Sequence, residues 1–217
     1  MVTLVEIKEV RKGRRTYFPY SRWVLHPIAN YLVWIAVRLG VTPNQVTVLS
    51  CIVGMIGCSF LAIGNHTTIV IGGLLLLIYV LLDCVDGAIA RVTTTTTKYG
   101  QFIDVSAAYI IGGLVPLSIG LGLYFKTDMW WYLLISGVCA SAYLLGTAIS
   151  LLQGIIFTSK IQVPGSGTAN KIHITLLEVP IIIACAIFNY LEAYLFLYTA
   201  IYTYRVIGIM YAIRKGQ

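Results

Sequence analysis

Long runs of apolar residues, separated by short polar stretches, organise most of this chain. A helix that crosses a bilayer needs about 20 predominantly apolar residues, so such runs are candidate membrane spans. They cover residues 44–63, 68–90, 101–125, 130–157, 174–190 and 193–213. The pattern therefore predicts an all-α integral membrane protein with six transmembrane helices.

Residues 16–40 show a different pattern, in which polar side chains interrupt the apolar ones at helical spacing. Such a pattern favours an amphipathic juxtamembrane helix that lies along the membrane interface and ends at Gly40 and Pro43. The apolar positions are Trp23, Leu25, Ile28, Leu32, Ile35 and Ala36, and the polar ones are Arg22, His26, Asn30 and Arg38. The alternative is a seventh span. We expect two parts, residues 1–43 as cytoplasmic N-terminus and interfacial helix, and residues 44–217 as the membrane domain.

Composition agrees with this division and excludes a large soluble domain. Only 11% of the residues are charged and the mean hydropathy is +0.87, whereas soluble domains carry about a quarter charged residues. Basic residues gather before the first span, in the loops at 91–99 and 158–173, and at the C-terminus. By the positive-inside rule, this distribution places both termini and these two loops in the cytoplasm. The net charge of +7 favours contact with anionic membrane lipids, and we expect no nucleic-acid partner.

Three aspartates stand at the predicted cytoplasmic ends of two apolar runs. Asp83 and Asp86 are three residues apart and project from one side of a helix. Asp104 lies beyond the loop at 91–99, near the start of the next apolar run. A carboxylate inside a membrane span is costly, by about 2.5 to 3.5 kcal/mol at its centre, so these side chains need a compensating partner. Their placement near one membrane face argues against a transporter pathway, whose acids are expected near the midplane.

The residue types around these aspartates indicate a metal-assisted phosphate site that opens to the cytoplasm. Oxygen ligands suit a hard divalent cation, so Mg²⁺ or Mn²⁺ is the expected occupant. Gly87 and Ala90 leave room beside the carboxylates, and Arg91 can bind phosphate oxygens. The alternative is that the carboxylates cap helix ends and pair with Arg91 or Lys98.

The spacing from Asp83 to Asp104 reads D-x-x-D-G-x-x-A-R, eight residues, G, three residues, D. It resembles the signature of the CDP-alcohol phosphotransferase (CDP-alcohol phosphatidyltransferase) family of membrane enzymes in phospholipid synthesis. The resemblance implies transfer of a phosphatidyl or phosphoalcohol group from a CDP-linked donor to an alcohol acceptor, with release of CMP. A lipid donor such as CDP-diacylglycerol is favoured over a soluble one, and a homodimer is expected.

The resemblance also implies roles for individual residues. Asp83, Asp86 and Asp104 would hold one or two divalent ions. The CDP donor would contact the start of the first span, the end of the second span and the segment that leads into the third. The residues concerned are Asn44, Gln45, Val46, Thr47, Asp83, Gly87, Ala90, Arg91, Thr97 and Gly100.

The family pattern has a further aspartate four residues after Asp104, assigned as metal ligand and general base, and Ala108 occupies that position here. An alanine can neither bind a metal nor accept a proton. Three interpretations remain: a natural subfamily that supplies the base from elsewhere, an engineered inactive form, or a degenerate relative that binds donor and metal without turnover.

Substitute residues for the base and for the acceptor site come from the second half of the chain. Glu178 or His173 can serve as the base, and Arg205 can bind an anionic substrate group. Alternatively, Glu178 and Arg205 form a structural ion pair at similar membrane depth. Lys160 and Lys171, in the most polar internal loop, are candidate ligands for the acceptor or for a phosphate, and a solvated cytoplasmic loop is the other interpretation.

Overall fold

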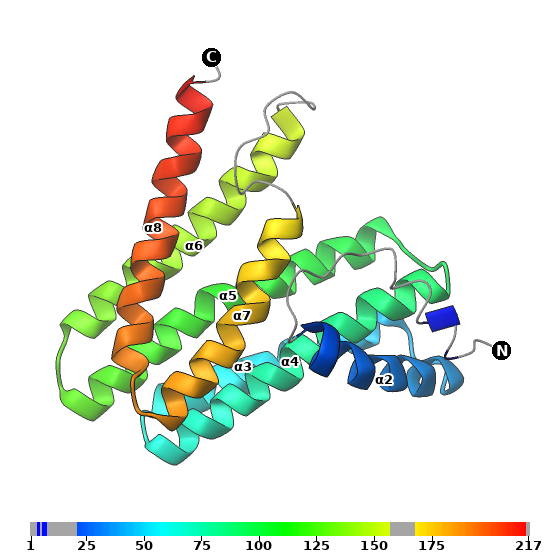
Figure 1. The fold of residues 1–217 in the computed structure, drawn as a ribbon, viewed down its shortest axis with the longest axis horizontal. Helices are drawn as coiled ribbons and strands as arrows, with labels where there is room; N and C mark the ends of the chain where they lie inside the picture. The colour runs from blue at the N-terminus through cyan, green and yellow to red at the C-terminus, as the bar shows by residue number, and fades with distance from the viewer. Residues whose placement is uncertain (1–3, 5, 8–20, 157–167, 216–217) are drawn as a thin grey trace. The chain divides into compact units, whose positions relative to one another are not determined.

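The computed structural model describes residues 4, 6–7, 21–156 and 168–215, and all of its regular elements in these ranges are helical (Figure 1). A π-helical turn, η1 (Ser21–Leu25), leads into the first α-helix. The α-helices are α2 (His26–Arg38), α3 (Pro43–Ile63), α4 (His66–Val92), α5 (Lys98–Thr127), α6 (Trp131–Ile156), α7 (Thr168–Ile187) and α8 (Leu191–Lys215).

Five of these helices, α3, α4, α5, α6 and α8, are long and apolar enough to cross a membrane. This confirms the predicted all-α membrane architecture. The sixth expected span falls on α7, whose apolar part within the described side chains is the shorter stretch Glu178–Ile187. The total of six spans therefore stays a prediction.

Local sequence explains where α3 and α5 begin. The backbone N–H of Thr42 donates to the side-chain oxygen of Gln45 at 2.9 Å, and the N–H of Gln45 points back to the Thr42 hydroxyl at 3.4 Å. This reciprocal capping box starts α3 with Pro43 at its first position. At the start of α5, the N–H of Gly100 donates to the Thr97 hydroxyl at 3.0 Å, so Thr97 caps that helix.

Gly64 ends α3 in a left-handed conformation, with φ of +83°, and a side chain there would also collide with the backbone carbonyl of Gly122. Gly40 has a similar φ of +70° but has open space around the position of a Cβ.

We expect Gly40→Ala to cost about 1 kcal/mol of stability, from the backbone conformation alone, and Gly64→Ala to cost several times more. Unfolding of the two variants in detergent measures the difference in stability. Equal losses of stability would contradict the close approach of Gly64 to the backbone of Gly122.

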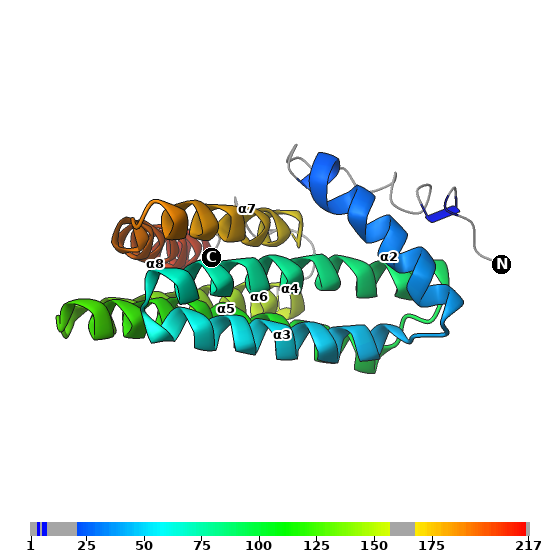
Figure 2. The ribbon, with the colours of Figure 1, turned by 90° about the horizontal axis from the view of Figure 1, so that it is seen from below.

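The chain forms two compact units. Each of the helices α3, α4 and α5 is divided between them, with one end in each unit. Unit 1 comprises residues 1–56 and 75–108. Its core joins the buried face of α2 to the second half of α4, through the side chains of Ile7, Ala29, Val33, Val46, Val85, Ala88 and Ile89. Figure 2 shows α2 crossing the end of α4 at an angle. This packing holds the end of α4 that carries Asp83 and Asp86.

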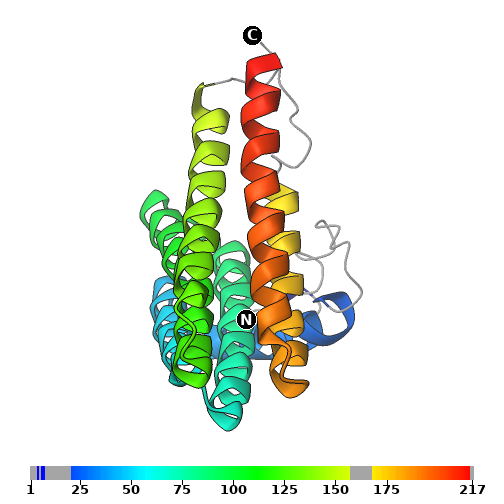
Figure 3. The same ribbon diagram turned by 90° about the vertical axis from the view of Figure 1, so that its left-hand side faces the viewer.

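Unit 2 comprises residues 57–74 and 109–217, and α6 and α8 run side by side within it (Figure 3). Small residues allow close helix contacts in this unit. The Tyr143 ring on α6 fills the space beside Gly112 on α5, and Val206 on α8 packs against Gly146 on α6. Tyrosines of α8 point into the same interior, because Tyr194, Tyr198 and Tyr202 are all buried.

Candidate metal and phosphate site

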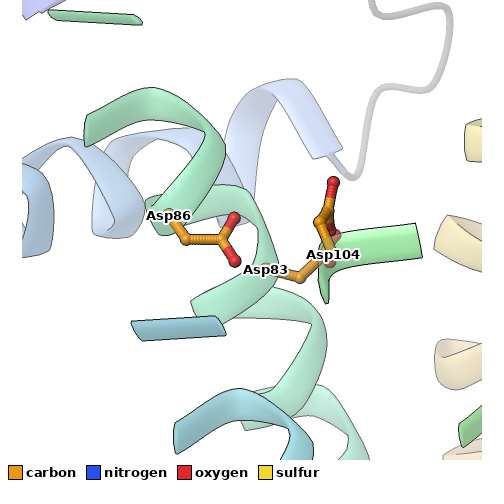
Figure 4. A group of neighbouring side chains, drawn as sticks. All are labelled: Asp83, Asp86 and Asp104. Carbon is orange, nitrogen blue, oxygen red and sulfur yellow. The ribbon is translucent and has the colours of Figure 1, made fainter. Parts of the chain in front are cut away.

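Asp83, Asp86 and Asp104 come together in unit 1 (Figure 4). Each offers one carboxylate oxygen, and these oxygens all lie within 4.8 Å of one another. Asp86 is buried, Asp83 is partly buried and Asp104 is exposed, so the cluster has an open side. The structure therefore gathers the three residues that the spacing of the sequence singled out.

The cluster forms because two consecutive helices carry the acids at their adjoining ends. Asp83 and Asp86 lie toward the C-terminal end of α4, which ends at Val92, and Asp104 lies in the second turn of α5, which begins at Lys98. Three residues correspond to almost one helical turn, so Asp83 and Asp86 face the same side of α4. The short connection through residues 93–97 brings Asp104 back to them.

The carboxyl groups of Asp83 and Asp104 are within hydrogen-bonding reach of each other. Two carboxylates at that separation repel unless a proton or a cation lies between them. The donor set consists of carboxylate oxygens, which Mg²⁺ and Mn²⁺ prefer. The residues present therefore fit a divalent cation.

Thr47 on α3 fixes one of these carboxylates. Its hydroxyl donates to Oδ2 of Asp86 at 2.5 Å, and both residues are only 4% exposed. Such a hydrogen bond orients a metal-binding carboxylate and leaves its other oxygen available. The family resemblance placed Thr47 in the nucleotide pocket, and the contact with Asp86 is an additional role that the sequence did not indicate.

We expect Thr47→Val to weaken Mn²⁺ binding about tenfold or more, because loss of an outer-shell hydrogen bond typically costs 10- to 100-fold in metal affinity. A titration followed by electron paramagnetic resonance measures the affinity. Thr147→Val is the matched control. The Thr47 hydroxyl also donates to the carbonyl of Pro43, four residues back, at 3.1 Å, and the Thr147 hydroxyl makes the same kind of bond to Tyr143, at 2.8 Å, on a helix without these carboxylates. Equal affinities in the two variants would show that Thr47 does not support the site.

Arg91 supplies positive charge beside the acids. Its guanidinium acts electrostatically on Asp86 and Asp104. A Cβ on Gly87, one turn earlier on α4, would lie 3.2 Å from Nη1 of Arg91, so the glycine gives the guanidinium room to fold back along the helix. Ala90 is partly buried on the same helix. A cation held here together with Arg91 would present positive charge to a phosphate group.

The start of α3 and the start of α5 meet at Gly100. A Cβ on this residue would lie 2.8 Å from Oδ1 of Asn44 and 3.1 Å from the Thr97 hydroxyl, so only a glycine fits without displacement. Asn44 and Thr97 thus lie against the same backbone segment. Gln45 and Val46 have structural contacts, because Gln45 belongs to the capping box of α3 and Val46 lies in the core of unit 1.

Ala108 follows Asp104 by one helical turn on α5, and its side chain is partly buried. A residue four positions further along a helix faces the same side, so an acid at position 108 would point toward the cluster from Asp104's helix. Ala108 places only a methyl group at this position, which cannot bind a metal or accept a proton.

The other candidate residues lie in unit 2 or outside the described part. Glu178 is buried, and its carboxylate accepts hydrogen bonds from the hydroxyls of Tyr194, at 2.8 Å, and Tyr202, at 3.2 Å. Two tyrosines therefore hold Glu178 where the sequence suggested an ion pair with Arg205, and no such ion pair occurs among the described residues. Lys160 and the side chains of Lys171 and His173 lie outside the described residues.

Comparison with known proteins identifies the family of this chain. The profile of the CDP-alcohol phosphatidyltransferase family matches residues 40–212, which is most of the chain and includes all three aspartates. The chain belongs to the CDP-alcohol phosphatidyltransferase family.

Individual relatives are more distant. The chain is 28% identical over 103 residues to archaetidylinositol phosphate synthase of Pyrococcus horikoshii, a match that covers 48% of this chain and 53% of the relative. It thus spans about half the length of that relative. The inner membrane protein YnjF of Escherichia coli is 30% identical over 151 residues, which is 68% of each chain.

A solved structure shows the same fold. Phosphatidylinositol phosphate synthase of Mycobacterium tuberculosis, in a crystal structure with CDP-DAG bound, superimposes with a TM-score of 0.65. The match covers 88% of this chain and 93% of the other, at 18% sequence identity.

Proposed function

We propose that this protein is a metal-dependent transferase of phospholipid synthesis. It moves a phosphatidyl or phosphoalcohol group from a CDP-linked donor to an alcohol acceptor and releases CMP. The observation that carries the proposal is the cluster of Asp83, Asp86 and Asp104, whose oxygens lie within 4.8 Å of one another beside Arg91. Membership of the CDP-alcohol phosphatidyltransferase family supports the same reaction class.

In the reaction, the acceptor's hydroxyl oxygen bonds to the phosphorus that carries the transferred group and loses its proton to a base or to water. The bond from that phosphorus to the bridging oxygen breaks, and this oxygen leaves with CMP. One or two Mg²⁺ or Mn²⁺ ions, bound by the three aspartates, would neutralise charge on the diphosphate and on the departing CMP. Thr47 holds Asp86 in position, and Arg91 binds phosphate oxygens. Gly87 and Ala90 leave space for the donor on α4, and Asn44, Thr97 and Gly100 provide polar and backbone contacts for its nucleotide.

We propose a lipid donor similar to CDP-diacylglycerol. The structural relative from M. tuberculosis contains CDP-DAG, and the acids of this chain lie on helices apolar enough to span a membrane. Arg205 is the candidate for binding an anionic group of a substrate, together with Lys160 and Lys171.

We also propose that α2 lies in the membrane interface and that both termini and the aspartate cluster face the cytoplasm. Apolar side chains of η1 and α2 are left exposed by the residues that the structure describes: Trp23 is 75% exposed, and Ile28, Tyr31 and Ile35 are also exposed. Arg38 stacks on the Trp34 ring at 3.8 Å, a pairing suited to the boundary between lipid and water. The homodimer expected from the family resemblance stays a prediction.

Ala108 supports a second candidate function. Without a carboxylate at this position, the protein can bind donor and metal but has no base from that turn of α5 to accept the acceptor's proton. It would then be a CDP-lipid-binding protein without turnover. CMP release by the purified protein, with Mg²⁺, CDP-diacylglycerol and a panel of alcohols, separates the two candidates, because only the transferase releases CMP.

A further inference from the structure

Glu178 has an unusual environment for an acidic residue in an apolar helix. Both of its carboxylate oxygens are engaged, Oε1 by the hydroxyl of Tyr194 and Oε2 by that of Tyr202. All three side chains are buried, with exposed fractions of 8%, 1% and 3%. The two tyrosines are eight residues apart on α8, about 12 Å along the helix axis, and each binds a different oxygen of the carboxylate. We call Glu178, Tyr194 and Tyr202 the carboxylate clamp.

The carboxylate clamp fixes how α8 is set against α7. A shift of α8 along its axis would lengthen one of the two hydrogen bonds, and a rotation would lengthen both. Aromatic contacts hold the rings of the two clamp tyrosines in place on α8. Tyr198 stacks on Tyr194 with ring centroids 4.2 Å apart, and the Tyr143 ring of α6 meets Tyr202 edge-on at 5.3 Å.

Arg205 lies three residues after Tyr202, on the same side of α8. Its Nε and Nη2 atoms are buried and have no hydrogen-bond partner in the part of the chain that the structure describes. These two nitrogens form one edge of the guanidinium, the edge that binds a carboxylate or phosphate with two parallel hydrogen bonds. Buried donors without a partner are costly, and a cation within a spanning helix usually marks a functional site.

We infer that Glu178 is a positioning residue: through Tyr194 and Tyr202 it sets α8 so that the buried edge of Arg205 binds an oxyanion, the phosphate of a soluble phosphoalcohol or of a lipid. The inference rests on the substrate-binding role of Arg205 in the proposed function. It assigns Glu178 to orientation, because both of its oxygens already accept hydrogen bonds within unit 2.

The test measures phosphate binding directly, in a maltoside detergent that contains no phosphate. Purified protein is titrated with glycerol 3-phosphate in one arm and with phosphatidic acid in mixed micelles in the other. We expect saturable binding in at least one arm, which identifies the source of the phosphate, and loss of that binding in Arg205→Gln. Glu178→Gln and Tyr202→Phe should each weaken it about tenfold or more, because the guanidinium edge then loses its alignment.

Tyr198→Phe is the matched control, because it removes a hydroxyl between the two clamp tyrosines on the same helix face but keeps the ring that stacks on Tyr194. The hydrogen bonds of Glu178 come from Tyr194 and Tyr202 and are left intact. Its affinity for phosphate should stay within about twofold of the parent. Thermal unfolding of each variant is recorded in parallel. A clamp that only stabilises the fold would lower the unfolding temperature of Glu178→Gln and Tyr202→Phe while leaving the dissociation constant unchanged, and that result would overturn the inference.

Absence of phosphate binding in the parent protein, or unchanged binding in Arg205→Gln, would overturn it as well. Mg²⁺-dependent CMP release in the same preparations keeps the proposed function separate. If the parent binds phosphate as expected but releases no CMP, the transferase proposal fails and the role of the carboxylate clamp stands. If CMP is released but Glu178→Gln leaves the affinity for phosphate unchanged, the transferase proposal stands and the role of the carboxylate clamp fails.

Discussion

Replacing Asp83 by asparagine should lower Mg²⁺-dependent CMP release from CDP-diacylglycerol by about 10²- to 10³-fold, the usual cost of losing one group that stabilises charge in a transition state. Asparagine keeps the size of the side chain but removes its charge. Asp83 lies in hydrogen-bonding reach of Asp104 and within 4.8 Å of the ligand oxygens of both other aspartates. Its charge is therefore part of the attraction that holds a divalent ion against a diphosphate.

The matched control for this prediction is Asp128→Asn. Asp128 is exposed, lies between α5 and α6, and has a φ of 59°, a conformation that asparagine accepts readily. CMP release by this variant should equal that of the parent protein. The account would be contradicted if Asp83→Asn also kept full activity at saturating Mg²⁺.

Restoring a carboxylate one turn after Asp104 should increase turnover. We expect Ala108→Asp to raise CMP release in the presence of an acceptor by about 10²-fold or more, because a positioned general base contributes 10²- to 10⁴-fold. The new side chain would start from the same side of α5 as Asp104, so it would add both a proton acceptor and an oxygen ligand to the cluster.

Ala108→Asn is the appropriate comparison, since it has almost the same shape as the aspartate without its charge. It should leave the rate at the level of the parent. If Ala108→Asp were no faster than Ala108→Asn, the base would have to come from a different residue, and the family's pattern at this position would not describe this chain's mechanism.

The sequence was sufficient to predict the five helices that are long and apolar enough to span a membrane, because their signal is local. Apolar runs at 44–63 and 193–213 correspond to α3 (Pro43–Ile63) and α8 (Leu191–Lys215) within about two residues at each end. The gathering of Asp83, Asp86 and Asp104 could also be predicted, since a short loop between two helices returns Asp104 to the end of α4.

Contacts that depend on how helices rotate against each other could not be predicted. The bond from Thr47 to Asp86 joins residues 39 positions apart, and nothing local distinguishes this threonine from its neighbours as a partner of the carboxylate. For Glu178, similar membrane depth suggested Arg205. The structure instead turns Tyr194 and Tyr202 toward the acid, and the four-residue spacing of tyrosines on α8 was the one available signal.

The proposed function requires that the three aspartates hold a divalent cation against the diphosphate of a CDP-linked lipid. Phosphorus NMR of CDP-diacylglycerol with the purified protein and substoichiometric Mn²⁺ tests it most directly, because the paramagnetic ion broadens only phosphorus nuclei close to it. We expect protein-dependent broadening of both diphosphate resonances, beyond that caused by Mn²⁺ alone, and loss of this broadening in Asp104→Asn. Equal broadening with the parent protein and with Asp104→Asn would contradict it.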